Sequence, residues 1–193
     1  LGAENVFAVT MPSPFSSPET IKDAHLLGRH LGIKLLTIPI ETIYRSYLNL
    51  LQSPFKGRRA DITEENIQAR IRGNILMALS NKFGWLVLTT GNKSELSVGY
   101  ATLYGDMAGG FAVLKDVYKT LVYRLVHFRN KSARGELIPS SIIKRPPTAE
   151  LHPNQKDQDV LPAYAVLDKI LRLYIEKDLS REDIIKKGYN AKV

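Results

Sequence analysis

The chain has 193 residues, 44% of them hydrophobic, which is enough to bury one sizeable core and predicts a single domain over residues 1–193. It contains no cysteine, which excludes disulfides, thiolate catalysis and cysteine-ligated zinc and fits a reducing compartment, so we expect a cytoplasmic protein. No apolar run reaches about 18 residues, which excludes a membrane-spanning helix. The net charge is +8, and residues 111–150 carry eight Lys or Arg against three acidic residues, Asp116, Glu136 and Glu150. A solvated face explains this charge best, and we expect neither nucleic acid nor a membrane as partner, although a basic segment can attract both.

Short apolar runs alternate with helical patterns along the chain. A run typical of a strand ends in a cluster of Pro and Ser, and the next helix begins at Pro18 with Ser17 as its cap and ends at Gly32. A later helix follows Asp61, whose spacing to Glu64 is that of a capping box. In chain order, these patterns predict strands at residues 6–9, 33–40 and 85–89, and helices at residues 18–31, 44–51, 62–83, 111–128, 164–176 and from 180 onward.

The alternation of strands and helices predicts an α/β fold with a largely parallel sheet flanked by helices. Ligands of such sheets bind beyond the carboxyl ends of the strands. Polar clusters follow two of the predicted strands, at residues 11–17 and 90–95. The sequence therefore predicts a binding edge there. Residues 130–162, rich in proline and polar side chains, are predicted to form a long loop.

Two side chains near this edge have more than one interpretation. Glu95, which follows Ser94, could favour a helix dipole, or could hold Mg²⁺ through its carboxylate oxygens. Lys119 stands among apolar residues, so its amine needs a partner. An anionic ligand, a carboxylate or solvent would each supply that partner. Asn66 and Arg70 are four residues apart and share one helix face, where a solvated polar surface is the simpler interpretation.

Taken together, the motifs resemble the synthetase domain of the glutamine-dependent NAD⁺ synthetases. They stand in that family's order and spread over most of the chain. The matching stretches are Met11-Pro-Ser13, Thr63-Glu-Glu-Asn-Ile-Gln-Ala-Arg-Ile-Arg-Gly73, Thr90-Gly-Asn-Lys-Ser-Glu95, Gly99-Tyr-Ala-Thr-Leu-Tyr-Gly-Asp-Met-Ala-Gly-Gly110, Tyr118-Lys119 and Arg145-Pro-Pro-Thr-Ala-Glu-Leu151.

The resemblance implies the adenine-nucleotide α-hydrolase-like fold of the ATP pyrophosphatases, and a ligase of NAD biosynthesis. In the implied reaction, the carboxylate of deamido-NAD⁺ attacks the α-phosphorus of ATP, giving an adenylate and pyrophosphate, and ammonia then displaces AMP. A glutaminase domain supplies the ammonia in the full-length enzyme, Mg²⁺ is the implied metal, and family members assemble as homo-oligomers.

By position, the resemblance also assigns site residues. Glu95 matches a glutamate of the substrate site that also holds Mg²⁺. The positions that contact ATP match Met11, Thr90, Lys119 and Thr148. The positions that bind deamido-NAD⁺ match Asn66, Arg70, Glu95, Tyr100, Ala101, Thr102, Leu103 and Asp106.

The chain departs from the family pattern in two ways. Leu103 and Gly110 stand where the ammonia-dependent branch has Lys and Asp, which favours the glutamine-dependent branch. The family's Ser-Gly-Gly-x-Asp-Ser phosphate loop is not in the sequence, so we expect a fragment truncated at both ends that has little activity alone. A non-catalytic nucleotide-binding or assembly module remains the alternative, as does a related ligase of the same fold, against which residues 99–110 argue.

Overall fold

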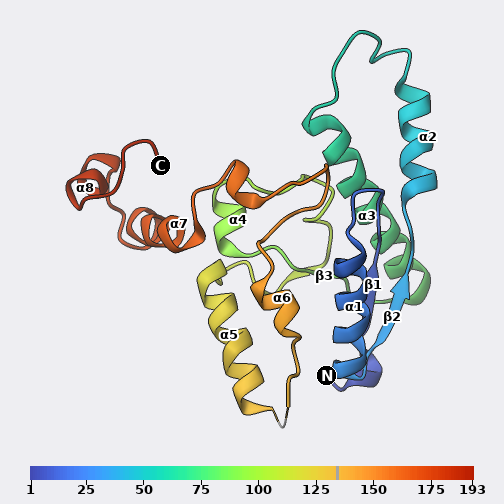
Figure 1. Ribbon diagram of the computed structural model, residues 1–193, viewed down its shortest axis with the longest axis horizontal. Coiled ribbons are helices and arrows are strands. Elements are labelled where there is room, and N and C mark those ends of the chain that lie inside the picture. Colours follow the sequence, from blue (N-terminus) through green and yellow to red (C-terminus); the bar gives the residue numbers. More distant parts are fainter. Residues whose placement is uncertain (134) are drawn as a thin grey trace.

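The computed structural model describes residues 1–133 and 135–193 (Figure 1). Its strands are β1 (Phe7–Thr10), β2 (Lys34–Thr37), β3 (Leu88–Thr89) and β4 (Phe111–Ala112). The helices, in chain order, are η1 (Ala3–Asn5), α1 (Pro18–Leu31), α2 (Glu41–Leu51), α3 (Ile62–Phe83), α4 (Lys93–Ser97), α5 (Lys119–Ser132), α6 (Ser140–Lys144), η2 (Asp157–Asp159), α7 (Tyr164–Leu171), η3 (Arg172–Glu176) and α8 (Arg181–Lys186). None of the helices in these two ranges combines the length and the apolar character that crossing a membrane requires.

The strands pair in parallel, as the α/β alternation predicted. β1 lies beside β2, with Phe7 opposite Lys34, and β3 lies beside β4, with Leu88 opposite Phe111. Within the described chain these are two separate two-stranded sheets instead of one central sheet. The ring of Phe7 stacks on that of Trp85, with centroids 4.2 Å apart, and this contact joins the first sheet to the segment that leads into β3.

Helix ends lie where the capping residues predicted them. The Ser17 side chain accepts a hydrogen bond from the Thr20 amide at the start of α1, and Gly32 ends that helix in the left-handed conformation at φ 65°. The Asp61–Glu64 capping box is formed at the start of α3. These local contacts account for the accuracy of the predicted boundaries of α1 and α3.

Two apolar clusters hold the helices together. The first joins α2 to α3 and consists of Ile40, Tyr44, Ile67 and Ile71. The second lies between the start of α5 and α7 and consists of Tyr118, Tyr164, Leu167 and Leu171. Figure 1 shows α7 reaching from the middle of the molecule to α8, and α5 beneath α4 in that view.

Three predicted segments differ in detail from the structure. The helix expected from residue 111 begins only at Lys119, because the Gly110 and Phe111 amides both donate to the Val87 carbonyl and draw this segment alongside β3 as β4. The loop expected over residues 130–162 contains α6 and η2. The predicted helix at residues 164–176 is α7 followed by the π-helical turn η3.

Candidate functional site

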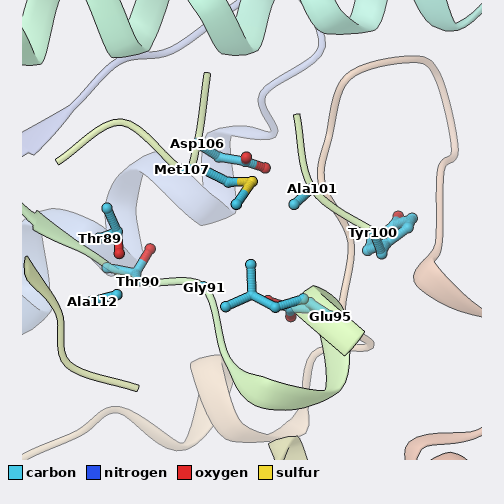
Figure 2. Close-up of a pocket in the computed structure, with 10 residues that line it drawn as sticks. Thr89, Thr90, Gly91, Glu95, Tyr100, Ala101, Asp106, Met107 and Ala112 are labelled. Carbon is cyan, nitrogen blue, oxygen red and sulfur yellow. The ribbon is translucent and has the colours of Figure 1, made fainter. Parts of the chain in front are cut away.

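A cavity of about 160 Å³ lies beyond the carboxyl end of β3 (Figure 2). Figure 2 shows Asp106 and Met107 across the cavity from Glu95, with Thr89 and Thr90 to one side. The predicted binding edge at residues 90–95 therefore coincides with a real hollow. The residues that line it are Thr89, Thr90, Gly91, Glu95, Leu96, Tyr100, Ala101, Asp106, Met107 and Ala112.

Glu95 lies in the first turn of α4 and caps its start, as the first of its two interpretations predicted, while its role as a Mg²⁺ ligand stays a prediction. As the third residue after the Asn92 cap of α4, its carboxylate accepts from the Asn92 amide at 3.4 Å, and the Glu95 amide donates to Asn92 Oδ1 at 3.2 Å. Its other oxygen, Oε1, accepts from Lys119 Nζ at 2.7 Å. The carboxylate that satisfies the half-buried Lys119 amine is thus Glu95, which lines the cavity.

The turn at residues 100–106 is fastened to α3. Thr102 Oγ1 donates to Asn66 Oδ1 at 2.8 Å, and Arg70 Nε donates to the Leu103 carbonyl at 3.2 Å. Asp106 Oδ1 accepts from the Thr102 amide at 2.8 Å. These contacts bring five residues that were predicted separately into one arrangement, with Asp106 facing the cavity and Arg70 on the helix behind the turn.

A pair of glycines permits this close approach. A Cβ on Gly105 would stand 2.9 Å from the Ala69 carbonyl carbon, and one on Gly73 would stand 2.7 Å from the Gly105 oxygen. Both distances are below ordinary contact, so the turn can lie against α3 only because these positions have no side chain.

Burial is the main cause of the raised pKa values of two side chains in the turn, Asp106 and Tyr100. Desolvation raises the pKa of Asp106, more than the hydrogen bond from the Thr102 amide lowers it. Burial also raises the pKa of Tyr100, whose hydroxyl donates to Asp157 Oδ1 at 3.2 Å. Tyr164 donates to the other oxygen of Asp157 at 2.7 Å, so both phenols stay protonated and act as donors.

Seven of the twelve predicted site residues do not line this cavity. Arg70 and Leu103 line a second, more open groove of about 510 Å³ beside it. Asn66, Thr102 and Lys119 hold the cavity walls through the hydrogen bonds described above. Met11 and Thr148 line neither hollow: the Met11 carbonyl accepts from Arg72, and Thr148 Oγ1 accepts from the Glu150 amide.

The segment that carries Thr148 is bound to the start of α1. The Glu150 carboxylate accepts from the Ser17 amide and hydroxyl and from Thr20 Oγ1, at 2.8–3.2 Å. Arg145 donates to Thr20 Oγ1 and pairs with Asp23. These hydrogen bonds tie the loop to the end of the first polar cluster, residues 11–17, which was predicted to be part of the binding edge.

Two buried aspartates near the cavity, Asp157 and Asp168, could not be recognised as important from the sequence. Asp157 is 3% exposed and joins two tyrosines, yet its neighbours are polar and proline-rich and resemble an ordinary loop. Asp168 is equally buried, in a helix that was predicted only as a helix. Burial of an acidic residue depends on partners distant in sequence, and no local pattern announces it.

The chemistry of the donors fits Mg²⁺ only when a substrate supplies most of the ligands. In residues 1–133 and 135–193 no three acidic or histidine side chains gather closely enough to hold a metal ion by themselves. Mg²⁺ commonly takes one or two carboxylates, with phosphates and water completing its octahedron. Glu95 is the carboxylate of the cavity wall that would serve this way, since each of its oxygens has a lone pair left after its single hydrogen bond.

Comparison with known proteins agrees with this arrangement. The sequence profile of the NAD synthase family matches residues 1–193. A glutamine-dependent NAD(+) synthetase of Thermotoga maritima is 62% identical over 192 residues, which cover 100% of this chain and 33% of that protein. The chain thus spans about a third of the length of such curated relatives.

Solved structures give the same result. The glutamine-dependent NAD⁺ synthetase from Acinetobacter baumannii, in complex with ADP, is 50% identical with a TM-score of 0.74, covering 100% of this chain and 34% of that one. An NMN synthetase from Francisella tularensis is 28% identical with a TM-score of 0.75, covering 86% and 65%. These likenesses confirm the predicted ATP pyrophosphatase type of α/β fold. Matched over its whole length, the chain belongs to the NAD synthase family.

Proposed function

We propose that this chain forms most of the synthetase domain of a glutamine-dependent NAD⁺ synthetase, a carbon–nitrogen ligase. Its reaction would be the ATP-dependent amidation of deamido-NAD⁺ to NAD⁺, releasing AMP and pyrophosphate. Support comes from the family match over residues 1–193 and from the relatives named for that reaction. The single structural observation that supports it best is the ion pair between Lys119 and Glu95, the glutamate that lines a cavity beyond a parallel strand.

The proposed chemistry has two balanced steps. A carboxylate oxygen of deamido-NAD⁺ attacks the α-phosphorus of ATP while the bond from that phosphorus to the bridging oxygen breaks and pyrophosphate leaves. Ammonia then attacks the acyl carbon, loses a proton, and AMP departs with the electron pair of its bond to that carbon. Both departures develop negative charge on phosphate oxygens, which fixed cations stabilise.

In this scheme Lys119 is the fixed cation. Its ammonium is 2.7 Å from Glu95 and 5.3 Å from the centroid of the Tyr164 ring, so it is held in place before any ligand arrives. A charge fixed in advance costs little reorganisation when the phosphate charge develops. When bound, Mg²⁺ would supply further positive charge at the phosphates, with Glu95 as its protein ligand.

The remaining predicted site residues keep their proposed roles. Thr90 lines the cavity beside Glu95 and would contact ATP together with Met11 and Thr148. The turn with Tyr100, Ala101, Thr102, Leu103 and Asp106 would bind deamido-NAD⁺, and Asn66 and Arg70 would support it from α3. Asp106, at the wall opposite Glu95, would face the nicotinate end.

The experiment uses the full-length protein that contains this chain. It is supplied with ATP, Mg²⁺, deamido-NAD⁺ and either glutamine or ammonium, and NAD⁺, AMP and pyrophosphate are quantified. We expect equal amounts of the three products with both nitrogen sources. Formation of ADP and phosphate instead, or amidation of nicotinate mononucleotide in preference to deamido-NAD⁺, would contradict the proposal, and the likeness to an NMN synthetase makes that second substrate the appropriate competitor.

Two further features belong to the proposal. The ammonia would come from a glutaminase domain in the same protein, because the relatives are three times as long as this chain and are named glutamine-dependent. Assembly as a homo-oligomer and a cytoplasmic location stay predictions, which size-exclusion chromatography with light scattering and fractionation of the source cells would test.

A further inference from the structure

Helix α5 begins without a capping residue of its own. Its N-cap is Tyr118, whose side chain makes no capping hydrogen bond, and its first turn contains no acidic residue. The amides of the first turn of a helix have no partner within the helix, and in a buried position each needs an acceptor. Since Lys119 is the first residue of α5, whatever supplies those acceptors also fixes the backbone of Lys119.

The acceptors come from two other helices. The Lys119 amide donates to Ser94 Oγ at 2.8 Å, and the Thr120 amide donates to Asp168 Oδ2 at 2.9 Å. Ser94 in turn donates to Asp168 Oδ1 at 2.5 Å. One carboxylate therefore accepts from α4 and α5 together.

This cluster is sealed from solvent. Ser94 is 0% exposed and Asp168 is 3% exposed. A hydrogen bond that involves a buried ionised group is strong, and a missing partner there is costly. The contacts therefore define one position for the start of α5 relative to the first turn of α4.

The same first turn of α4 carries Glu95, the residue after Ser94. The Lys93 amide donates to the Val117 carbonyl at 3.0 Å, which adds a second tie between α4 and the segment before α5. From α7, Tyr164 lies under the Lys119 ammonium, one helical turn before Asp168. One face of α7 thus contacts the Lys119 ammonium through Tyr164 and the amide of the next residue, Thr120, through Asp168.

We infer that Asp168 is a positioning residue of this site, which acts through Ser94 and the start of α5 to set the Lys119 ammonium against Glu95. It does not line the cavity, and its two oxygens accept from the Ser94 hydroxyl and the Thr120 amide. The inference rests on the proposed function only in that Lys119 stabilises the negative charge that develops on the phosphates. The placement of α5 itself is independent of that function.

The test uses Asp168→Asn in the full-length protein. The amide keeps the size of the side chain, but one of its two acceptor oxygens becomes a donor, so Ser94 and Thr120 can no longer both be satisfied. We expect kcat of deamido-NAD⁺-dependent ATP–pyrophosphate exchange to fall about ten- to a hundredfold, because a small misplacement of a charged group costs rates of that order. KM for ATP is expected to change less than about threefold, since the loss falls on the transition state.

A double-mutant cycle separates positioning from general damage. If Asp168 acts through Lys119, then Asp168→Asn does not lower kcat further in a protein that already carries Lys119→Met. If the fold-losses in kcat of the two single variants multiply in the double variant, the inference is overturned. Leu171→Val, one turn further along α7, is the control: it removes buried carbon without touching these hydrogen bonds and is expected to lower the unfolding temperature with kcat unchanged. An equal fall of kcat in that control would also overturn the inference.

Hydrogen exchange gives a readout that needs no catalysis. In Asp168→Asn the amides of Lys119 and Thr120 are expected to exchange at least about tenfold faster, while those of α3 stay unchanged. Unchanged protection at both amides would overturn the inference. If the wild-type protein fails to make NAD⁺, the proposed function is wrong. Hydrogen exchange still tests whether Asp168 places the start of α5. Should Asp168→Asn not fold, Ser94→Ala removes the link between the helices and carries the same expectations.

Discussion

Replacing Glu95 by glutamine tests the ion pair at the cavity wall. The substitution keeps the shape of the side chain, and its remaining oxygen can still accept from the Asn92 amide. The amide nitrogen then faces the Lys119 ammonium, which is left without an acceptor. The capping of α4 is retained while the pair is lost, so the change isolates one contact.

The expected cost follows from the geometry of the pair. At the 2.7 Å that separates Lys119 Nζ from Glu95 Oε1, two unit charges attract by about 6 kcal/mol at an effective dielectric of about 20, and the cost of desolvating both charges makes the net effect much smaller. The side chains of Lys119 and Glu95 are 21% and 18% exposed, so some attraction is lost to solvent. Hydrogen bonds to charged groups are worth about 1.5–3 kcal/mol. We therefore expect the free energy of unfolding to fall by about 2 kcal/mol.

Activity should suffer more than stability. Glu95 fixes Lys119 and is the proposed Mg²⁺ ligand, so kcat of ATP–pyrophosphate exchange should fall about a hundredfold or more at saturating Mg²⁺. The assay follows the return of labelled pyrophosphate into ATP in the presence of deamido-NAD⁺ and needs no ammonia. Glu41→Gln is the control, because its pair with Arg45 is 49% and 70% exposed and is worth at most about 0.5 kcal/mol. A Glu95→Gln enzyme that exchanges pyrophosphate at the wild-type rate would refute the reasoning.

Three further predictions concern the turn at residues 100–106. Thr102→Val removes the hydrogen bond to Asn66, so the free energy of unfolding in urea should fall by about 1 kcal/mol and KM for deamido-NAD⁺ should rise. An unchanged KM would show that the turn does not bind that substrate. Gly105→Ala would bring a methyl group to within 2.9 Å of Ala69, so the free energy of unfolding should fall by about 1–3 kcal/mol. An unfolding midpoint equal to that of the wild type would show that the turn can move away from α3 without cost. Burial raises the pKa of Asp106, so the folded state holds this proton more tightly than the unfolded chain, and stability from Asp106 declines as pH rises from the ordinary carboxyl value through the raised one. Asp106→Asn should remove that decline, and an unaltered pH profile of unfolding would contradict it.

Local signals explain what the sequence could predict. Ser17 and Gly32 bracket α1, and Asp61 opens α3, because caps act over three or four residues that are all visible in the sequence. The polar run after β3 predicted a binding edge for the same reason, since strand and cluster are adjacent in the chain. The cavity beside Glu95 confirms that a hollow lies at this edge.

Contacts between distant segments explain what the sequence could not predict. β4 is a strand because it pairs with β3 and the Phe111 amide donates to the Val87 carbonyl, although the pattern from Phe111 onward is typical of a helix. The apolar neighbours of Lys119 indicate that its amine needs a partner, but they do not say whether a ligand, a carboxylate or water supplies it. Glu95, 2.7 Å away in the fold, is that partner. Asp168 was not singled out at all, because its partners are 74 and 48 residues away along the chain.

The most direct test of the central claim is a crystal structure of the full-length protein with Mg²⁺, deamido-NAD⁺ and a non-hydrolysable analogue of ATP. The account predicts a phosphate oxygen within about 3 Å of Lys119 Nζ, the distance of a charge-assisted hydrogen bond, with the nicotinate carboxylate beside the turn at residues 100–106. A triphosphate bound elsewhere, with Lys119 still paired only to Glu95, would contradict it.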